Sequence, residues 1–455
     1  MAKRQQLWPV LGAALVALCT ACTSYRPKPL AAPDMESILD DPSPSALEAG
    51  ASALRHALLK PVKLDLGAPL SLDEVSIIAV IANPDLAALR VQQQVADAQV
   101  FASGLLPDPQ LSAGLDRVLS PKGVGLVTAY SAGLSLDVLG SLLARRSERD
   151  VARAAARQMR LDVAWAEWNT AGTARVLAIR LQYQQRAAAL AQDASTLAMR
   201  LLDDVKAAAA AGDLKGDDLQ PQRLAGLDAV ARASAARKDA AATRLELNRV
   251  LGMRPEVDLA IATLPPPATA MLASSNELFA LARRQRLDLQ ALAEGYRGQE
   301  SRLRRSVLGQ YPRVSVTLSR ARDTSAVQTW GPAVAFDLPL WNRNRGEIAQ
   351  AAATREQLRT EYASRLHQTR AEIAAVRDAL RADEEALPAV RQQADALAEL
   401  AQAYDLAAAR GDVSRVAAAA TRLASLDRQI TAMGLQQACD EQRVALALLT
   451  GEPFP

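Results

Sequence analysis

The sequence predicts a mostly α-helical protein with a small transmembrane β part, built from one unit that occurs twice. Two observations predict this architecture: a register match between the two halves of the chain, and four short runs of alternating apolar and polar residues set between long alanine-rich stretches. Half of the 455 residues are hydrophobic, but only 4% are aromatic. Because alanine favours helices and lets them approach closely, this composition indicates long, tightly packed helices rather than a thick globular core.

Charge and cysteine content exclude several classes of protein. The 53 Lys and Arg residues nearly balance the 50 Asp and Glu residues, so nothing in the charge indicates a nucleic-acid partner. Two of the 3 cysteines lie near the N-terminus, which excludes a disulfide framework and a Cys/His metal cage. The histidines, His56 and His367, are isolated and are expected at the surface. No nucleophile–base pair, phosphate-binding loop or metal-ligand spacing appears, so we expect neither an enzyme nor a cofactor.

The first residues have the features of an export signal. Two basic residues precede an apolar segment that is too short to cross a bilayer, and 1–21 is therefore predicted to be a signal peptide. The small residues Thr20 and Ala21 before Cys22 resemble the lipobox of bacterial lipoproteins, in which the cysteine is acylated, with palmitate for example, after cleavage. The alternative is a plain signal peptide with an incidental cysteine. The Pro-rich segment 22–70 is then expected to follow the lipidated cysteine in the periplasm.

An internal repeat determines the domain organisation. A shift of 203 residues places Asp85-Leu86 on Asp288-Leu289, and a shift of 199 later places Gly212 on Gly411. A register that drifts by so little over most of each half indicates a duplicated unit. The predicted boundaries are 71–254 for the first repeat, 255–273 for a Pro-rich connector and 274–452 for the second repeat.

Each repeat shows the same order of predicted elements. A helix of moderate length leads to two strands, a very long helix, a Gly-Asp turn and a descending helix. The moderate helices are expected at about 85–106 and 275–309, the long helices at about 141–211 and 343–410, and the descending helices at about 217–251 and 413–450.

The second long helix carries a seven-residue rhythm. Between Tyr362 and Tyr404, mostly apolar residues step alternately by four and three, with Thr369 and Asp383 as polar exceptions. This spacing predicts a coiled-coil seam. Pro388 lies within the pattern and is expected to kink the helix or to mark a local irregularity.

Four short runs predict β-strands because apolar and polar residues alternate in them with a period of two. Apolar-out and polar-in alternation over about ten residues is typical of a transmembrane barrel strand. The alternative is a pair of soluble hairpins packed on helices. Aromatic residues at or near the strand ends, Tyr130, Trp330 and Trp341, favour the membrane interpretation, whereas Pro332 removes a ladder donor. The four runs are 110–117, 130–138, 313–319 and 330–338.

Four strands are too few to close a barrel. Open strand edges are not tolerated in lipid, and the smallest membrane barrels have about eight strands. If the runs cross a membrane, the chain must therefore form an oligomer.

The segment Phe336–Ala351 resembles the strand-to-helix junction of the TolC-like outer-membrane efflux family, and its Asn-Arg-Asn-x-Gly form is similar to the heavy-metal efflux branch. Further matching places are Asn83–Leu86 and the Gly411–Ser414 turn. The resemblance extends over nearly the whole mature chain through the duplicated order of elements.

This resemblance implies a lipid-anchored outer-membrane homotrimer with a large periplasmic part. Three chains would contribute four strands each to a 12-stranded β-barrel, which a periplasmic α-helical barrel continues. The implied function is the channel component of a tripartite efflux system, a passive export duct for small substrates, including heavy-metal cations. Its partners would be outer-membrane lipid, a periplasmic adaptor (membrane fusion) protein and a proton-driven inner-membrane pump of the RND type. The competing hypothesis is a lipid-anchored periplasmic coiled-coil scaffold without a pore.

The strand–helix junction is a candidate site with two interpretations. Asn342, Arg343, Asn344 and Gly346 suit a sharp turn, in which the arginine faces the membrane surface. The alternative is that these residues contact substrate.

The two Gly-Asp turns are the candidate periplasmic tip. The family places its tip between the long and descending helices, which corresponds here to Gly212 and Gly411. A ring of carboxylates from three chains would repel itself and attract cations, so a gate is one interpretation. The other is helix N-capping by Asp213 and Asp412. The candidate gate residues are Asp213, Asp217, Asp218 and Asp412.

Overall fold

The computed structural model describes residues 25–30, 35–36, 39–106, 108–117, 128–137, 139–212, 219–264 and 272–454, without the side chains of 137–144 and 313. The chain divides into two units, Met1–Asp41 and Pro42–Pro455, of which the second is described below. The predicted signal peptide 1–21 and the lipidation candidate Cys22 lie outside the described residues.

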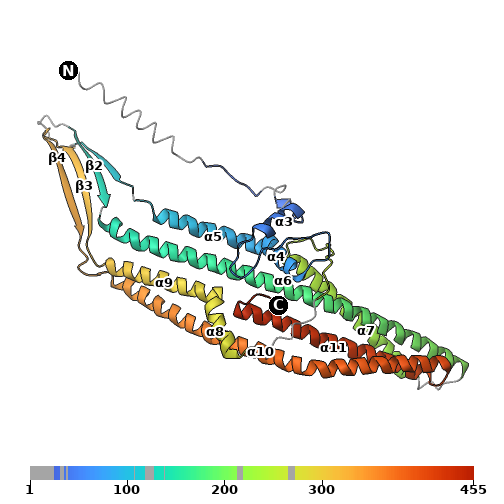
Figure 1. Cartoon of the computed structure of the whole chain (residues 1–455). Helices are drawn as coiled ribbons and strands as arrows, with labels where there is room; N and C mark the ends of the chain where they lie inside the picture. Colours follow the sequence, from blue (N-terminus) through green and yellow to red (C-terminus); the bar gives the residue numbers. More distant parts are fainter. Residues whose placement is uncertain are drawn as a thin grey trace. The chain divides into compact units, whose positions relative to one another are not determined.

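The second unit contains the predicted element order twice, after a first helix α3 (Pro44–Ala53). Both copies run helix pair, strand pair, long helix and descending helix, as Figure 1 shows. The first copy consists of α4 (Leu72–Ala82), α5 (Pro84–Ser103), β1 (Gln110–Asp116), β2 (Ala129–Asp137), α6 (Leu139–Ala211) and α7 (Leu219–Val250). The second consists of α8 (Ser275–Gln285), α9 (Leu287–Leu308), β3 (Arg313–Arg322), β4 (Gln328–Asp337), α10 (Arg345–Arg410) and α11 (Arg415–Thr450).

The two copies also begin in the same way. The side chain of Ser71 accepts a hydrogen bond from the Glu74 backbone while Glu74 reaches back to the cap, and Ser274 and Glu277 form the same capping box. Each box satisfies backbone donors that the first turn of a helix leaves free. The positions differ by 203 residues, the shift that relates the two halves of the sequence.

The moderate helix of the second repeat is two helices, so the prediction of one helix over 275–309 is wrong. The chain breaks at Arg286, which has an extended backbone (φ −62°, ψ 121°). In the first copy the same break falls at Asn83, where the following Pro84 disfavours helical backbone at the preceding residue. The second copy has no proline here. Its buried Arg286 instead donates hydrogen bonds of 2.9 and 2.8 Å to Asp288.

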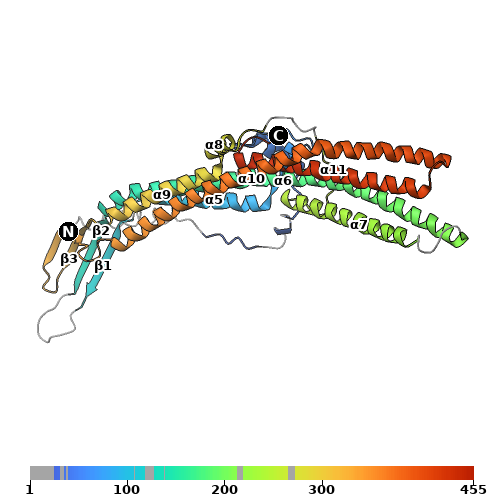
Figure 2. The ribbon, with the colours of Figure 1, turned by 90° about the horizontal axis from the view of Figure 1, so that it is seen from below.

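The four strands form one antiparallel sheet in the order β1-β2-β3-β4. The central pairing of β2 with β3 joins the two copies, with Leu134 opposite Leu318. The strand predictions are thereby confirmed. In both views of the second unit, the helices α5, α6, α9 and α10 lead away from the sheet, and α7 and α11 lie farther along the long helices (Figures 1 and 2).

The main core lies around the middle of α6. Trp168 is fully buried there, and its ring stacks on Phe454 with the centroids 4.1 Å apart. Leu47 of α3, Ile78 of α4 and Leu247 near the end of α7 belong to the same cluster. The core therefore ties the segment before the first repeat, the long helix and the last residues of the chain together.

The coiled-coil seam of α10 is confirmed. About half of its predicted members are buried and the others, such as Val376 and Leu397, are half-buried. Ile373 and Leu380 pack with Cys439 and Leu446 of α11. The polar exception Asp383 accepts a hydrogen bond of 2.8 Å from Gln442. The helix continues through Pro388 to Arg410, so the proline does not end it. The buried members are Thr369, Ile373, Leu380, Leu387, Ala394 and Ala401.

One histidine is placed differently from the prediction. The side chain of His56 is only 1% exposed, and its Nδ1 accepts hydrogen bonds from the backbones of Leu58 and Leu59. Its Nε2 lies 2.8 Å from the Ala164 carbonyl oxygen and donates to it, because Nδ1 is the acceptor. The surface assignment was therefore wrong for His56, whereas His367 is exposed as predicted.

In the described parts of the chain, the helices lack the combination of length and apolarity that crossing a membrane requires.

Candidate functional site

The sheet gathers the apolar residues of all four runs on one face. Directly opposed residues of antiparallel strands lie on the same face of a sheet. Leu134 is opposite Leu111 on one side and Leu318 on the other, and Val314 is opposite Phe336. The face is not covered by the chain, since Leu111 is 79% exposed and Phe336 is 60% exposed. The sheet therefore presents a continuous apolar surface.

The other face of the sheet is polar and closely spaced. Thr317 donates a hydrogen bond of 3.2 Å to Ser135 across β2 and β3, and Ser112 donates one of 3.3 Å to the Gly133 carbonyl. A Cβ atom on Gly133 would lie 2.9 Å from the Ser112 hydroxyl oxygen. The middle of this face consists of small hydroxyl, glycine and alanine residues, as expected for the inside of a barrel, and Gln110, Asp116 and Asp337 lie on it at the strand ends.

Aromatic residues lie at both ends of the sheet, and arginines join them at one end. The apolar face of β3 continues into Arg320 and Arg322, which are opposite Trp330 and Tyr130 near the β3–β4 turn. Trp341, at the helix end of the sheet, is 89% exposed. Aromatic and basic residues at this depth are typical of the interface between hydrocarbon and headgroups. The predicted third run, 313–319, stopped short of these arginines.

The strand–helix junction is a turn held by unusual backbone conformations. Arg343 and Asn344 both have left-handed backbones, with φ of 46° and 54°. The Asn342 carbonyl accepts a hydrogen bond of 3.0 Å from the Arg345 backbone, which closes the turn directly before α10. Asparagine tolerates this region better than most residues, whereas arginine is strained in it.

The Asn344 side chain explains why the turn is needed. Its amide donates a hydrogen bond of 2.7 Å to the Ser306 carbonyl near the end of α9. The contact is close, since a Cβ on Gly309 would lie 2.6 Å from the Asn344 amide nitrogen. Gly346, in contrast, has open space around it. Within the chain, the Asn344 amide therefore joins α10 to α9. The Arg343 side chain is exposed and forms no hydrogen bond or ion pair with the described residues.

The turn between α10 and α11 is confirmed at Gly411. Gly411 is left-handed (φ 84°) and its backbone N–H bonds to the carbonyls of Ala407 and Ala408, which ends α10. The left-handed conformation favours glycine because it has no Cβ. Gly212 at the end of α6 has the same conformation (φ 87°).

Asp412 does not cap α11, so the capping interpretation of this residue is wrong. The N-cap is Ser414, whose hydroxyl accepts a hydrogen bond of 3.1 Å from the Ala417 backbone. Asp412 instead forms an exposed ion pair of 3.0 Å with Arg410. The other gate candidates, Asp213, Asp217 and Asp218, lie outside the described residues.

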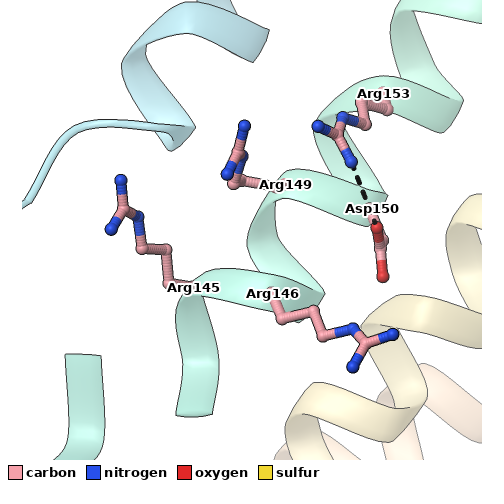
Figure 3. A pocket seen from close by; sticks show the side chains of 5 residues that line it. All are labelled: Arg145, Arg146, Arg149, Asp150 and Arg153. Atoms are coloured by element: carbon pink, nitrogen blue, oxygen red, sulfur yellow. Dashed lines mark ion pairs between the residues drawn. The ribbon is translucent and has the colours of Figure 1, made fainter. Parts of the chain in front are cut away.

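A basic pocket near the start of α6 was missed by the sequence reasoning. It is lined by Arg145, Arg146, Arg149, Asp150 and Arg153 (Figure 3). The signal was visible in the sequence, because arginines at positions 145, 149 and 153 share one face of a helix. Among the described residues, no group of three or more His, Cys, Asp or Glu side chains is placed to hold a metal ion.

The chain is similar in structure to solved outer-membrane channels, while no protein-family model and no curated protein matches it. The outer-membrane channel OprN superposes with a TM-score of 0.71, over 96% of this chain and 100% of that chain, at 16% identity. The CmeC outer membrane channel of Campylobacter jejuni has a TM-score of 0.71 over 84% of this chain and 86% of its own, at 14% identity. CusC, described as forming a transmembrane channel, has a TM-score of 0.68 over 84% and 92% of the two chains, at 16% identity. The chain therefore has the fold of the TolC-like outer-membrane efflux channels.

Proposed function

We propose that the chain is the outer-membrane channel component of a tripartite efflux system, a passive export duct across the outer membrane and the periplasm. The observation that carries this proposal is the sheet, which exposes an apolar face and has two edge strands, β1 and β4, with no further strand beside them in the described residues. Lipid offers no hydrogen bonds to a strand edge. The edges must therefore pair with strands of further copies of the chain.

The number of copies is three in this proposal. Two chains supply only the smallest number of strands known to close a membrane barrel, about eight, and three supply 12. The sequence resemblance favours three. Exposed apolar residues on the helices support an oligomer independently, because they recur at helical spacing. They are Val91 and Val95 on α5, and Leu224, Leu227 and Val230 on α7.

The polar face of the sheet supports a passive duct rather than a binding protein. Ser112, Ser135 and Thr317 offer hydroxyl groups that hydrogen-bond to the sheet itself. Such a lining lets small hydrated solutes pass without holding them. Heavy-metal cations are proposed as substrates because the Asn342–Gly346 motif resembles that of the heavy-metal efflux branch. The likeness to CusC supports the shared fold.

The remaining parts of the proposal concern attachment and partners. Acylation of Cys22 would anchor the chain in the outer membrane, and mass spectrometry of the mature N-terminus is expected to find an acylated cysteine. A mature chain that begins beyond residue 22 would contradict it. A periplasmic adaptor protein would join the helical end to a proton-driven inner-membrane pump of the RND type.

The central experiment separates a duct from a lipid-anchored scaffold without a pore. The full chain, purified in detergent, is expected to be a trimer by light scattering and to give stable conductance steps in planar bilayers. A stable monomer with intact β content by circular dichroism would contradict the barrel. A trimer without conductance would favour the scaffold.

A further inference from the structure

We propose that the pocket at the start of α6 binds a phosphoryl group through Arg145 and Arg149. The pocket has a volume of about 370 Å³ and is lined by four arginines and Asp150. Figure 3 shows Arg145 and Arg149 directed toward one side of α6 and Arg146 directed away from them. The proposed ligand is thus an anion held between Arg145 and Arg149 on that side of α6.

The guanidinium groups of the pocket are only partly used by the chain. Arg145 donates to the Gly104 carbonyl through Nη2. The Nε atoms of Arg145 and Arg149 are buried and have no hydrogen-bond partner. A buried donor without an acceptor is costly, and an anion in the pocket would supply acceptors.

The nearby carboxylates do not neutralise the pocket. Asp150 lies 3.9 Å from Arg153, in a half-exposed pair. Glu148, the next acidic residue of α6, is bound at 2.9 Å by Arg305 of α9. Among the described residues, Arg145 and Arg149 form no ion pair, since Asp150 and Glu148 pair with other arginines. These two guanidinium groups therefore have no counterion among the described side chains.

The arginine side chain indicates which anion fits. Its planar fork of N–H donors matches the oxygens of a phosphoryl group in a bidentate manner, and it stays charged when partly buried. A small carboxylate would satisfy one guanidinium, whereas a phosphoryl group has enough oxygens to bridge two. We therefore assign the pocket to phosphoryl groups.

Two sources could supply that group at this place in the fold. Arg145 follows Leu139, the first residue of α6, by six residues, which corresponds to about 9 Å of helix beyond the sheet. The polar headgroup layer of a bilayer is about 5–8 Å thick on each side. A phospholipid headgroup and a soluble phosphorylated anion can both reach the pocket. Only the lipid source rests on the proposed function, since the pocket itself does not require a membrane.

The test compares the wild-type chain with the double variant Arg145→Gln/Arg149→Gln, both as full chains in detergent. Pyrophosphate is titrated calorimetrically, and retained phosphatidylglycerol is counted by native mass spectrometry. The variant is expected to bind at least one of these probes about tenfold more weakly. The matched control, Arg223→Gln/Arg237→Gln, removes the same charge from exposed positions on α7 and is expected to bind like the wild type.

The outcome identifies the source of the phosphoryl group or contradicts the proposal. Loss of retained phosphatidylglycerol alone assigns the pocket to lipid headgroups, and loss of pyrophosphate binding assigns it to soluble anions. Equal binding of both probes by wild type and pocket variant would overturn the site, whether or not the protein conducts. If the glutamine variant fails to assemble, Arg145→Lys/Arg149→Lys keeps the charge but removes the fork, and unchanged affinity in that variant would overturn it as well.

Discussion

The helical body and the sheet place the same kind of residue in opposite surroundings. In the α10–α11 seam, Ile373 and Leu380 have no exposed surface. In the sheet, Leu111 is 79% exposed and Trp330 is 71% exposed. Apolar surface is stabilising only when it leaves water. The helical body is therefore stabilised by its own contacts, whereas in the proposed channel the sheet depends on lipid and on further copies of the chain.

The largest expected effect is in the helical body, from Asp288→Asn. Arg286 is 1% exposed and pairs with Asp288 at 2.8 Å, so the change leaves a buried charge with less compensation. Breaking such a pair costs about 3–5 kcal/mol in the free energy of unfolding. Urea unfolding followed by far-UV circular dichroism measures it. Asp116→Asn, an exposed change in β1, is the control and is expected to stay within about 0.5 kcal/mol.

The same pair gives a pH dependence with a defined sign. Burial alone would raise the pKa of Asp288, but the hydrogen bonds and charges of Arg286 and Arg365 outweigh it and lower the pKa in the folded chain. The stabilisation is therefore complete above the unfolded value of about 4 and is lost as the pH falls through the folded pKa. The loss of unfolding free energy caused by Asp288→Asn should be largest near neutral pH and should shrink below about pH 4. A deficit that grows on acidification would contradict the pairing.

A leucine-to-alanine substitution can be made both in the helical body and in the sheet, which sharpens the comparison. Leu380→Ala empties a fully buried position and is expected to cost about 2–5 kcal/mol. Leu111→Ala removes a side chain that touches little of its own chain and is expected to cost less than about 1 kcal/mol for the helical unfolding transition. Thermal unfolding of both variants in the same detergent checks this. Equal losses would show that the sheet has a core of its own.

The fourth prediction asks what covers the apolar face. Leu134→Arg places a charge among Leu111 and Leu318 and should cost about 2–4 kcal/mol in lipid vesicles if the position is near the midplane. Ser135→Arg, on the polar face of the same strand, should be better tolerated and should alter conductance instead. Folding into vesicles, followed by urea titration, measures the difference. Similar tolerance of both variants would exclude a lipid-facing sheet.

The smallest effect is expected at the turn after α10. Ser414→Ala removes the N-cap of α11 and should cost about 0.5–2 kcal/mol. Asp412→Asn changes an exposed ion pair and should leave stability within about 0.5 kcal/mol. If Asp412 contributes to a gate, its loss should change cation preference in planar bilayers at low salt, where screening is weakest. Unchanged selectivity would direct the search to Asp213, Asp217 and Asp218.

The parts of the candidate site differ in how far the sequence could predict them. Gly212 and Gly411 were identifiable because glycine marks a left-handed helix end, and the junction residues because asparagine and glycine mark a turn. The role of Asn344 was not, because its partner is Ser306 on another helix. The role of Asp412 could not be predicted either, because Asp412 and Ser414 both lie close enough to cap α11. In the structure Ser414 is the N-cap.

The sequence by itself determined the repeat, because the register match runs over most of each half. It also determined the four strands and the seam of α10, because each is a periodic pattern that follows from local backbone geometry. Tertiary structure decided the break at Arg286, the burial of His56 and the hydrogen bond that holds Arg145 against the end of α5. Each of these depends on groups distant in the chain: Arg365 contacts Asp288, Ala164 bonds His56, and Gly104 bonds Arg145. Periodicity carries no information about such partners, since it states which face a residue occupies but not what meets that face.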